Sequence, residues 1–149
     1  MTERSTDMRP PLTREDIRLV LPHREPFLLV DRILDITESE RIVGEFTVTQ
    51  DELFLYRQVD PPQFPATLLA ESMAQVGAIL VLYPEDNRGR TIYFRGIEMA
   101  EFKSEACVGD TIRITATVKR LRSRLGSLHV RADVGERPLA EGLMSFALG

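Results

Sequence analysis

Residues 61–83, PPQFPATLLAESMAQVGAILVLY, decide the fold that this sequence predicts. The segment begins with three prolines within five residues and continues as one long helix that is apolar on nearly every side. A surface helix carries an apolar stripe, whereas a helix that is apolar all round is buried. We therefore expect the rest of the chain to wrap this helix.

Two polar side chains, Glu71 and Gln75, interrupt the apolar helix. They are four residues apart, so they lie one turn from each other on the same face. An acid in a buried helix is costly unless it is paired or neutralised. The question of function therefore narrows to the role of Glu71.

Length and composition are typical of one globular domain, with 149 residues, 43% of them hydrophobic and 28% charged. A net charge of -4 argues against a nucleic-acid-binding protein, which usually carries a basic excess. The single cysteine, Cys107, excludes an internal disulfide and a cysteine-based metal cluster. No apolar signal-peptide core opens the chain, and the longest apolar run, 74–83, is too short for a bilayer. We expect a cytoplasmic protein without a membrane partner.

The N-terminal region predicts a tail, a short helix and a turn. Residues 1–12 are polar with two prolines, which predicts a disordered tail before a single domain at 13–149. Thr13 and Asp16 form a capping-box pattern, so a short helix is expected to follow. Two further prolines in residues 21–27 predict an extended turn.

Most of the remaining chain predicts strands separated by turns. Strands are expected at 28–36, 40–48, 91–97, 100–105, 111–121, 128–134 and 139–148, with turns at 37–39, 108–110, 125–127 and 135–138. The last three strands predict an antiparallel meander, and its apolar face needs the long helix as a cover. We expect an α+β fold, a curved antiparallel sheet around one helix. Its exposed edges favour a dimer that continues the sheet.

Four segments resemble the FabZ-type 3-hydroxyacyl-[acyl carrier protein] dehydratases. They are LPHREPFLLVDRILD at 21–35, FPATLLAESMAQVGAIL at 64–80, IYFRGIEMAEFK at 92–103 and VGDTI at 108–112. The resemblance implies the hotdog fold, in which an antiparallel sheet wraps a long central helix. It also implies a homodimer or trimer of dimers that acts on acyl carrier protein thioesters in fatty acid, lipid or polyketide biosynthesis.

The same resemblance implies which residues form the active site. The family uses a histidine in a GHFP motif and a glutamate on the central helix, contributed by opposite subunits. ESMAQ matches the family's EAMAQ, which places the glutamate at Glu71. Counting back without a gap, the histidine position holds Arg57. The glycine of the family's MPG motif, whose backbone N–H holds the thioester carbonyl, is Ala66 here.

The replacement at position 57 bears on the chemistry. Dehydration needs a base for the C2 proton, an acid for the leaving hydroxyl and donors for the enolate oxygen. A guanidinium group cannot serve as the base. Two histidines exist, and we expect neither to be the base. His23 belongs to the LPHR turn, which the family keeps outside the reaction centre, and His129 lies on the polar face of its strand.

Three hypotheses follow for the function. The first is a dehydratase with altered chemistry, which family membership favours. The second is a thioesterase that uses Glu71 and the Ala66 N–H. The third is a non-catalytic acyl-binding or assembly partner, in which Arg57 forms a structural ion pair with Glu71 across the dimer interface.

The acyl chain is expected to contact Phe64, Phe94, Phe102 and Gln75 if the family pattern holds. For the three aromatic residues, the alternative is an ordinary place in the core. The chain has no Gly-rich phosphate loop and no metal-ligand spacing, so we expect no nucleotide, metal or other cofactor.

A local basic cluster stands out in this acidic chain, formed by Lys119, Arg120, Arg122 and Arg124. Its charge suits the acidic surface of an acyl carrier protein. The alternative is a solvated hairpin end.

Overall fold

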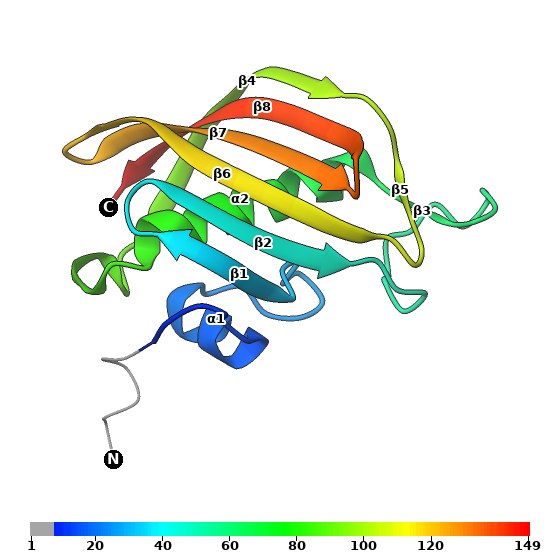
Figure 1. Ribbon diagram of the computed structural model, residues 1–149, viewed down its shortest axis with the longest axis horizontal. Helices are drawn as coiled ribbons and strands as arrows, with labels where there is room; N and C mark the ends of the chain where they lie inside the picture. Colours follow the sequence, from blue (N-terminus) through cyan, green and yellow to red (C-terminus); the bar gives the residue numbers. More distant parts are fainter. Residues whose placement is uncertain (1–7) are drawn as a thin grey trace.

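The computed structural model describes residues 8–149, and the predictions for residues 1–7 lie outside it. A six-stranded antiparallel sheet curves around the long helix α2 (Ala66–Leu82) (Figure 1). The strand order is β1-β2-β6-β7-β8-β4. The predicted α+β architecture, one long helix wrapped by an antiparallel sheet, is confirmed.

The elements before α2 are α1 (Arg14–Val20), β1 (Arg32–Thr37), β2 (Arg41–Thr47) and β3 (Gln63–Phe64). After α2 come the 3₁₀ helix η1 (Glu85–Asn87), β4 (Ile92–Phe102), β5 (Ala106–Cys107), β6 (Thr111–Arg122), β7 (Leu125–Val134) and β8 (Arg137–Leu148). The short strands β3 and β5 form a separate antiparallel pair. The meander β6-β7-β8 is as predicted.

The long helix begins at Ala66, five residues later than the predicted start. Pro65 is the N-cap residue, and the prolines before it lack the N–H that a helix interior needs. The predicted strand at 28–36 also starts late, at Arg32. Leu29, at the predicted start of that strand, is instead bound by the side chains of Ser72 and Gln75 of α2.

The capping box of α1 is confirmed. The Thr13 hydroxyl accepts the Asp16 N–H at 3.3 Å, and the Asp16 carboxylate accepts the Thr13 N–H at 2.9 Å. The expected tail, however, ends earlier than residue 12. Leu12 is fully buried and exchanges backbone hydrogen bonds with Ile33, at 2.8 and 3.0 Å. An apolar side chain that finds both a core site and a strand partner does not stay disordered.

The strand β4 replaces the two short strands predicted at 91–97 and 100–105. Its pairing with β8 shifts register between Glu98 and Glu101, and Met99 has a φ of 53°. The chain absorbs this irregularity without leaving the sheet, so the two predicted strands are one.

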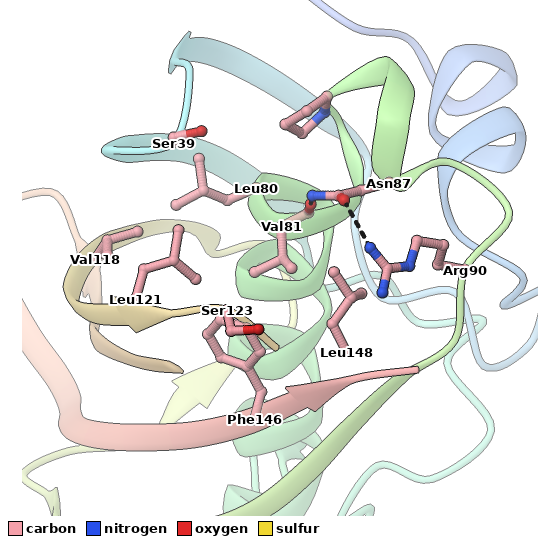
Figure 2. Close-up of a pocket in the computed structure, with 11 residues that line it drawn as sticks. Ser39, Leu80, Val81, Asn87, Arg90, Val118, Leu121, Ser123, Phe146 and Leu148 are labelled. Carbon is pink, nitrogen blue, oxygen red and sulfur yellow. Dashed lines mark hydrogen bonds between the residues drawn. The ribbon is translucent and has the colours of Figure 1, made fainter. Parts of the chain in front are cut away.

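The turn between β6 and β7 falls at Ser123 and Arg124, not at 125–127 as predicted. Ser123 adopts a φ of 53°, and Gly126 lies inside β7. A Cβ on Gly126 would lie 2.5 Å from the Phe146 ring, so the glycine makes room for that ring and does not form the turn. This hairpin reaches the C-terminal end of α2, where Ser123 lines a cavity with Leu80 and Val81 (Figure 2).

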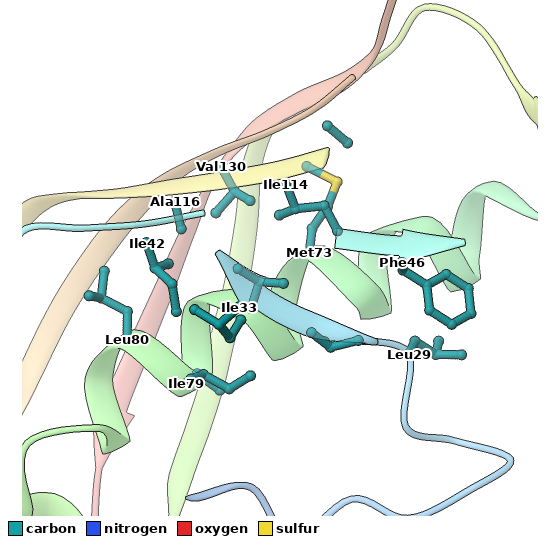
Figure 3. Close-up of a cluster of buried hydrophobic side chains, with 14 of the residues drawn as sticks. Leu29, Ile33, Ile42, Phe46, Met73, Ile79, Leu80, Ile114, Ala116 and Val130 are labelled. Atoms are coloured by element: carbon teal, nitrogen blue, oxygen red, sulfur yellow. The ribbon is translucent and has the colours of Figure 1, made fainter. Parts of the chain in front are cut away.

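The core lies between α2 and the concave face of the sheet (Figure 3). Met73 and Leu80 project from the helix on the side of Ile114 of β6 and Val130 of β7, whereas Ile79 lies on the side of the helix away from those two residues. All five side chains are at most 3% exposed. Full burial of one such side chain contributes about 1.5–3 kcal/mol. The sheet and the helix therefore stabilise each other.

Burial divides α2 into two halves. Every residue from Val76 to Leu82 is buried, as an all-round apolar helix requires. Towards the N-terminus, Ala66, Thr67 and Glu71 are exposed. The prediction of a buried helix therefore holds for the C-terminal half and is wrong for one face of the N-terminal half.

The strand β4 forms one edge of the sheet and carries large exposed apolar side chains. The most exposed are Tyr93, Ile97, Met99 and Phe102, at 50–88%. Within residues 8–149, no helix has the length and apolar character needed to cross a membrane.

Candidate active site

Glu71 lies on the open face of α2, where its side chain is 47% exposed. Thr67, one turn earlier on the same face, is exposed as well. The expectation of a buried acid is therefore corrected in this protomer. The helix leaves this carboxylate within reach of a substrate.

The Glu71 carboxylate has two polar neighbours in the described chain. The Gln75 amide donates a hydrogen bond to Oε1 at 3.1 Å, and His23 Nε2 lies 3.4 Å from the same oxygen. The hydrogen bond from His23 is the main cause that lowers the pKa of Glu71; burial opposes it, and Gln75 adds to the lowering. The carboxylate is therefore ionised at neutral pH.

His23 is the residue that sequence reasoning placed wrongly. It was expected to lie outside the reaction centre, yet it contacts Glu71. The two residues are 48 positions apart, so no local pattern joins them. The only available signal was the LPHR motif itself, which ends one residue beyond His23.

Gln75 holds the segment after the LPHR turn against α2. Its Oε1 accepts the Leu29 N–H at 2.8 Å, and its Nε2 donates to the Phe27 carbonyl at 2.7 Å. The neighbouring Ser72 hydroxyl donates to the Leu29 carbonyl at 2.6 Å. Gln75 is 1% exposed. Its predicted contact with substrate is therefore corrected, because all its polar atoms are committed inside the protein.

The N-terminus of α2 supplies unpaired donors near Glu71. Pro65 cannot cap the helix, and no side chain of the described residues does so. The first N–H groups of a helix, those of Ala66 and Thr67 here, have no intrahelical acceptor and carry the positive end of the helix dipole. These donors suit an anionic oxygen, the role expected of the Ala66 N–H.

Two small cavities flank this end of the helix and share Phe102. One, of about 100 Å³, is lined by Phe64, Ala66 and Phe102 among others. The second, of about 180 Å³, lies between α2 and the sheet, with Met73 and Phe102 in its wall. Phe64 and Phe102 therefore line cavities near Ala66, and their contact with an acyl chain stays a prediction. Phe94 lines neither cavity, and it pairs with Phe146 on β8.

Arg57 is exposed in the segment between β2 and β3. Its guanidinium donates to the carbonyls of Gln50 and Glu52, at 3.0 and 3.1 Å. Within one protomer, Arg57 thus stabilises its own loop. The ion pair with Glu71 of a second subunit stays a prediction.

The basic cluster lies on the outer face of the sheet. Lys119, Arg120 and Arg122 line a broad groove of about 680 Å³ with Arg95 of β4. Leu121 of the same strand lines the cavity at the C-terminal end of α2 (Figure 2). The cluster is therefore at the opposite end of the helix from Glu71.

A family model described as the FabA-like domain matches residues 21–141, which contain α2, Glu71 and His23. The chain belongs to the FabA-like family. Within this family it is similar to enzymes named 3-hydroxyacyl-[acyl-carrier-protein] dehydratase FabZ. The relative from Desulforamulus reducens is 44% identical over 134 residues, 89% of this chain and 94% of the relative. That from Herpetosiphon aurantiacus is 40% identical over 138 residues, 92% and 98% of the two chains.

Solved structures confirm the family's hotdog fold. The dehydratase heterocomplex ApeI:P from Xenorhabdus doucetiae has a TM-score of 0.79 at 16% identity, covering 89% of this chain and 90% of that one. A hypothetical thioesterase with coenzyme A from Streptococcus pneumoniae has a TM-score of 0.68 at 12% identity, covering 92% and 97%. Dehydratases and thioesterases share the fold, so only the residues of the site decide between them.

Proposed function

We propose that this FabZ-type protein is a 3-hydroxyacyl-[acyl carrier protein] dehydratase and that Glu71 is its catalytic carboxylate. The observation that carries the proposal is the position of Glu71, half-exposed and ionised beside the open N-terminus of α2. FabZ relatives at 40–44% identity over most of the chain support the substrate class.

The helix offers backbone N–H donors for the enolate oxygen and a carboxylate for the proton transfers. Ala66 and Glu71 are five residues apart, about 7.5 Å along the helix axis. In the proposed binding mode the Ala66 N–H holds the thioester oxygen, and carbons 2 and 3 of the acyl group lie within reach of Glu71. The N–H donors stabilise the enolate oxygen while the carboxylate handles the proton.

The proposed assembly is a homodimer joined through β4. An edge strand with exposed apolar side chains, among them Ile97 and Phe102, favours pairing with a second copy. The open face of α2 adjoins the same edge through the cavity that Ala70 and Ile97 line. A second subunit there would close the substrate site. We also propose that the carrier protein docks on Lys119, Arg120 and Arg122. The proposed location is the cytoplasm.

The test is a product assay with the 3-hydroxybutyryl thioester of acyl carrier protein. We expect enoyl product, and we expect Glu71→Gln to abolish it without loss of folded protein. Glu45→Gln is the matched control, because Glu45 also lies beside a basic side chain, Arg32, but lines neither of the two cavities near the helix N-terminus. Free acid in place of enoyl product would establish a thioesterase. Tight binding with no product would establish a non-catalytic partner.

A further inference from the structure

His23 and Glu71 form a contact between two segments that the protein holds firmly. His23 Nε2 lies 3.4 Å from Glu71 Oε1, and the two side chains are 35% and 47% exposed. The histidine comes from the turn between α1 and β1, and the glutamate from the open face of α2. The pair belongs to one protomer.

The turn that carries His23 is fixed from both sides. On the α2 side, Ser72 and Gln75 bind the backbone of Leu29 and Phe27. On the α1 side, the guanidinium group of Arg24 holds the turn through three hydrogen bonds to backbone carbonyls. It donates to the carbonyls of Leu21 and His23 at 2.9 and 2.8 Å, and to that of Arg18 at 3.2 Å. The backbone that carries His23 is therefore held in place beside α2.

The carboxylate that faces Nε2 selects the tautomer of His23. Nδ1 is buried and has no hydrogen-bond partner among the described residues, so it is unsatisfied with or without a proton. A neutral ring with its proton on Nδ1 would turn the Nε2 lone pair towards the Glu71 carboxylate, which can only accept hydrogen bonds. We therefore assign the proton to Nε2, where it is donated to the Glu71 carboxylate. His23 is then a donor to Glu71 and not an acceptor of protons from it.

We propose that His23 is a positioning residue, which holds Glu71 as an ionised general base for the dehydration reaction. This inference rests on the dehydratase function proposed above and names how its site works. The family resemblance implies that Arg57 stands at the histidine position, and a guanidinium group cannot take a proton. One carboxylate, held by His23, then performs both proton transfers.

The reaction balances with Glu71 alone. The carboxylate takes the C2 proton, and the electron pair of that C–H bond passes into the thioester as an enolate. As the C3–O bond breaks, this pair forms the C2–C3 double bond and the thioester carbonyl is restored. The Glu71 carboxylic acid gives the same proton to the departing hydroxyl, which leaves as water. The products are the enoyl thioester and water, and the carboxylate is regenerated.

The lowered pKa of Glu71 keeps the carboxylate ionised and also makes it a weaker base, so the positioning role rests on the contact with His23 and not on the pKa. The groups responsible are His23 from the turn, the largest contributor, and Gln75 from its own helix. Burial acts in the opposite direction without cancelling them.

The test compares His23→Leu, which removes the donor, with His23→Gln, which keeps an N–H donor without an imidazole. We measure kcat/KM against pH for the 3-hydroxybutyryl thioester of acyl carrier protein. In His23→Leu, kcat/KM should fall about 10- to 100-fold. The acidic limb of its pH profile should move to higher pH, because the donor that lowers the pKa of Glu71 is lost. His23→Gln should restore both. His129→Leu, which removes the histidine near Glu141, is the matched control and should leave the profile unchanged.

Two results would overturn the inference. An acidic limb that stays in place in a folded His23→Leu protein would mean that His23 does not act on Glu71. Equal loss of activity in His23→Gln and His23→Leu would mean that the imidazole itself carries the proton.

A second readout separates this inference from the proposed function. The Glu71 carboxyl, labelled with ¹³C and assigned by comparison with Glu71→Gln, is titrated by NMR in wild type and in His23→Leu. Its midpoint should rise in the variant, and an unchanged midpoint would refute the positioning role. If the wild-type protein gives no enoyl product, the dehydratase proposal fails, and the titration still decides whether His23 acts on Glu71.

Discussion

The two halves of α2 share one helix and differ in what surrounds them. From Val76 to Leu82 every residue is buried, whereas Ala66, Thr67 and Glu71 are exposed on one face. The buried half packs into the sheet and stabilises the fold. The open half presents a carboxylate and unpaired N–H donors. Because the two halves form one continuous helix, the packing of the buried half sets the position of the open half and of Glu71.

The largest expected effect breaks the buried half. Ile79→Ala removes a fully buried side chain, so the free energy of unfolding should fall by about 2–5 kcal/mol. Urea denaturation measures the change. The activity per folded molecule should stay near that of wild type, since Ile79 is two turns from Glu71. A loss of kcat with unchanged stability would show that the two halves are not divided as described.

The next effect lies at the junction of the halves. Gln75→Leu keeps a similar volume but leaves the Leu29 N–H and the Phe27 carbonyl without their partner. The cost in unfolding free energy should be about 1–3 kcal/mol, and kcat/KM should fall as well because the turn with His23 loosens. Ser72→Ala, which breaks one bond to Leu29, should lower both quantities less. Lower stability with unchanged kcat/KM would show that the bonds of Gln75 do not help to position His23 beside Glu71.

A third change tests the open half through the loop before it. Arg57→His places an imidazole at the position where the family resemblance implies one. Enoyl formation should rise on the order of tenfold, because the new group shares the proton transfers with Glu71. Stability should change little, since Arg57 is exposed and bonds only to carbonyls of its own loop. No gain in activity would mean that position 57 does not face Glu71 of a second subunit.

The smallest effect is the pH dependence of stability at Glu71. Its pKa is lower in the folded state, so the stability it adds is present above the unfolded pKa and is lost as pH falls through the folded one. The difference in unfolding midpoint between wild type and Glu71→Gln should therefore shrink from about pH 7 to about pH 3. The side chain is 47% exposed, so the difference is small. A difference that grows on acidification would contradict the lowered pKa.

The parts of the fold that follow from local chemistry could be predicted. The apolar run of α2, the capping box at Thr13 and the alternation in 111–121 each depend on neighbours in the chain. The kink at Met99 and the turn at Ser123 could not be predicted, because neither residue favours a positive φ. Gly126 was wrongly assigned to the turn, because a glycine is needed at this position to make room for the Phe146 ring.

The site divides in the same way. Glu71 could be identified from its place on an apolar helix and from the family motif. The contact with His23 could not, because tertiary packing joins residues 48 positions apart. The burial of Gln75 also depends on a distant segment, the backbone of 27–29. Sequence patterns thus identified the carboxylate, and only the folded chain shows what acts on it.

The kink at Met99 also limits how copies of this chain can aggregate. A flat exposed edge such as β4 is a template on which strands can add without end. The left-handed residue and the register shift beside it interrupt the straight row of backbone donors and acceptors between Glu98 and Glu101. A second register shift, between Phe94 and Gly96, divides the rest of the strand, so only short regular stretches remain on β4. The irregularity thus favours a closed assembly over a fibril.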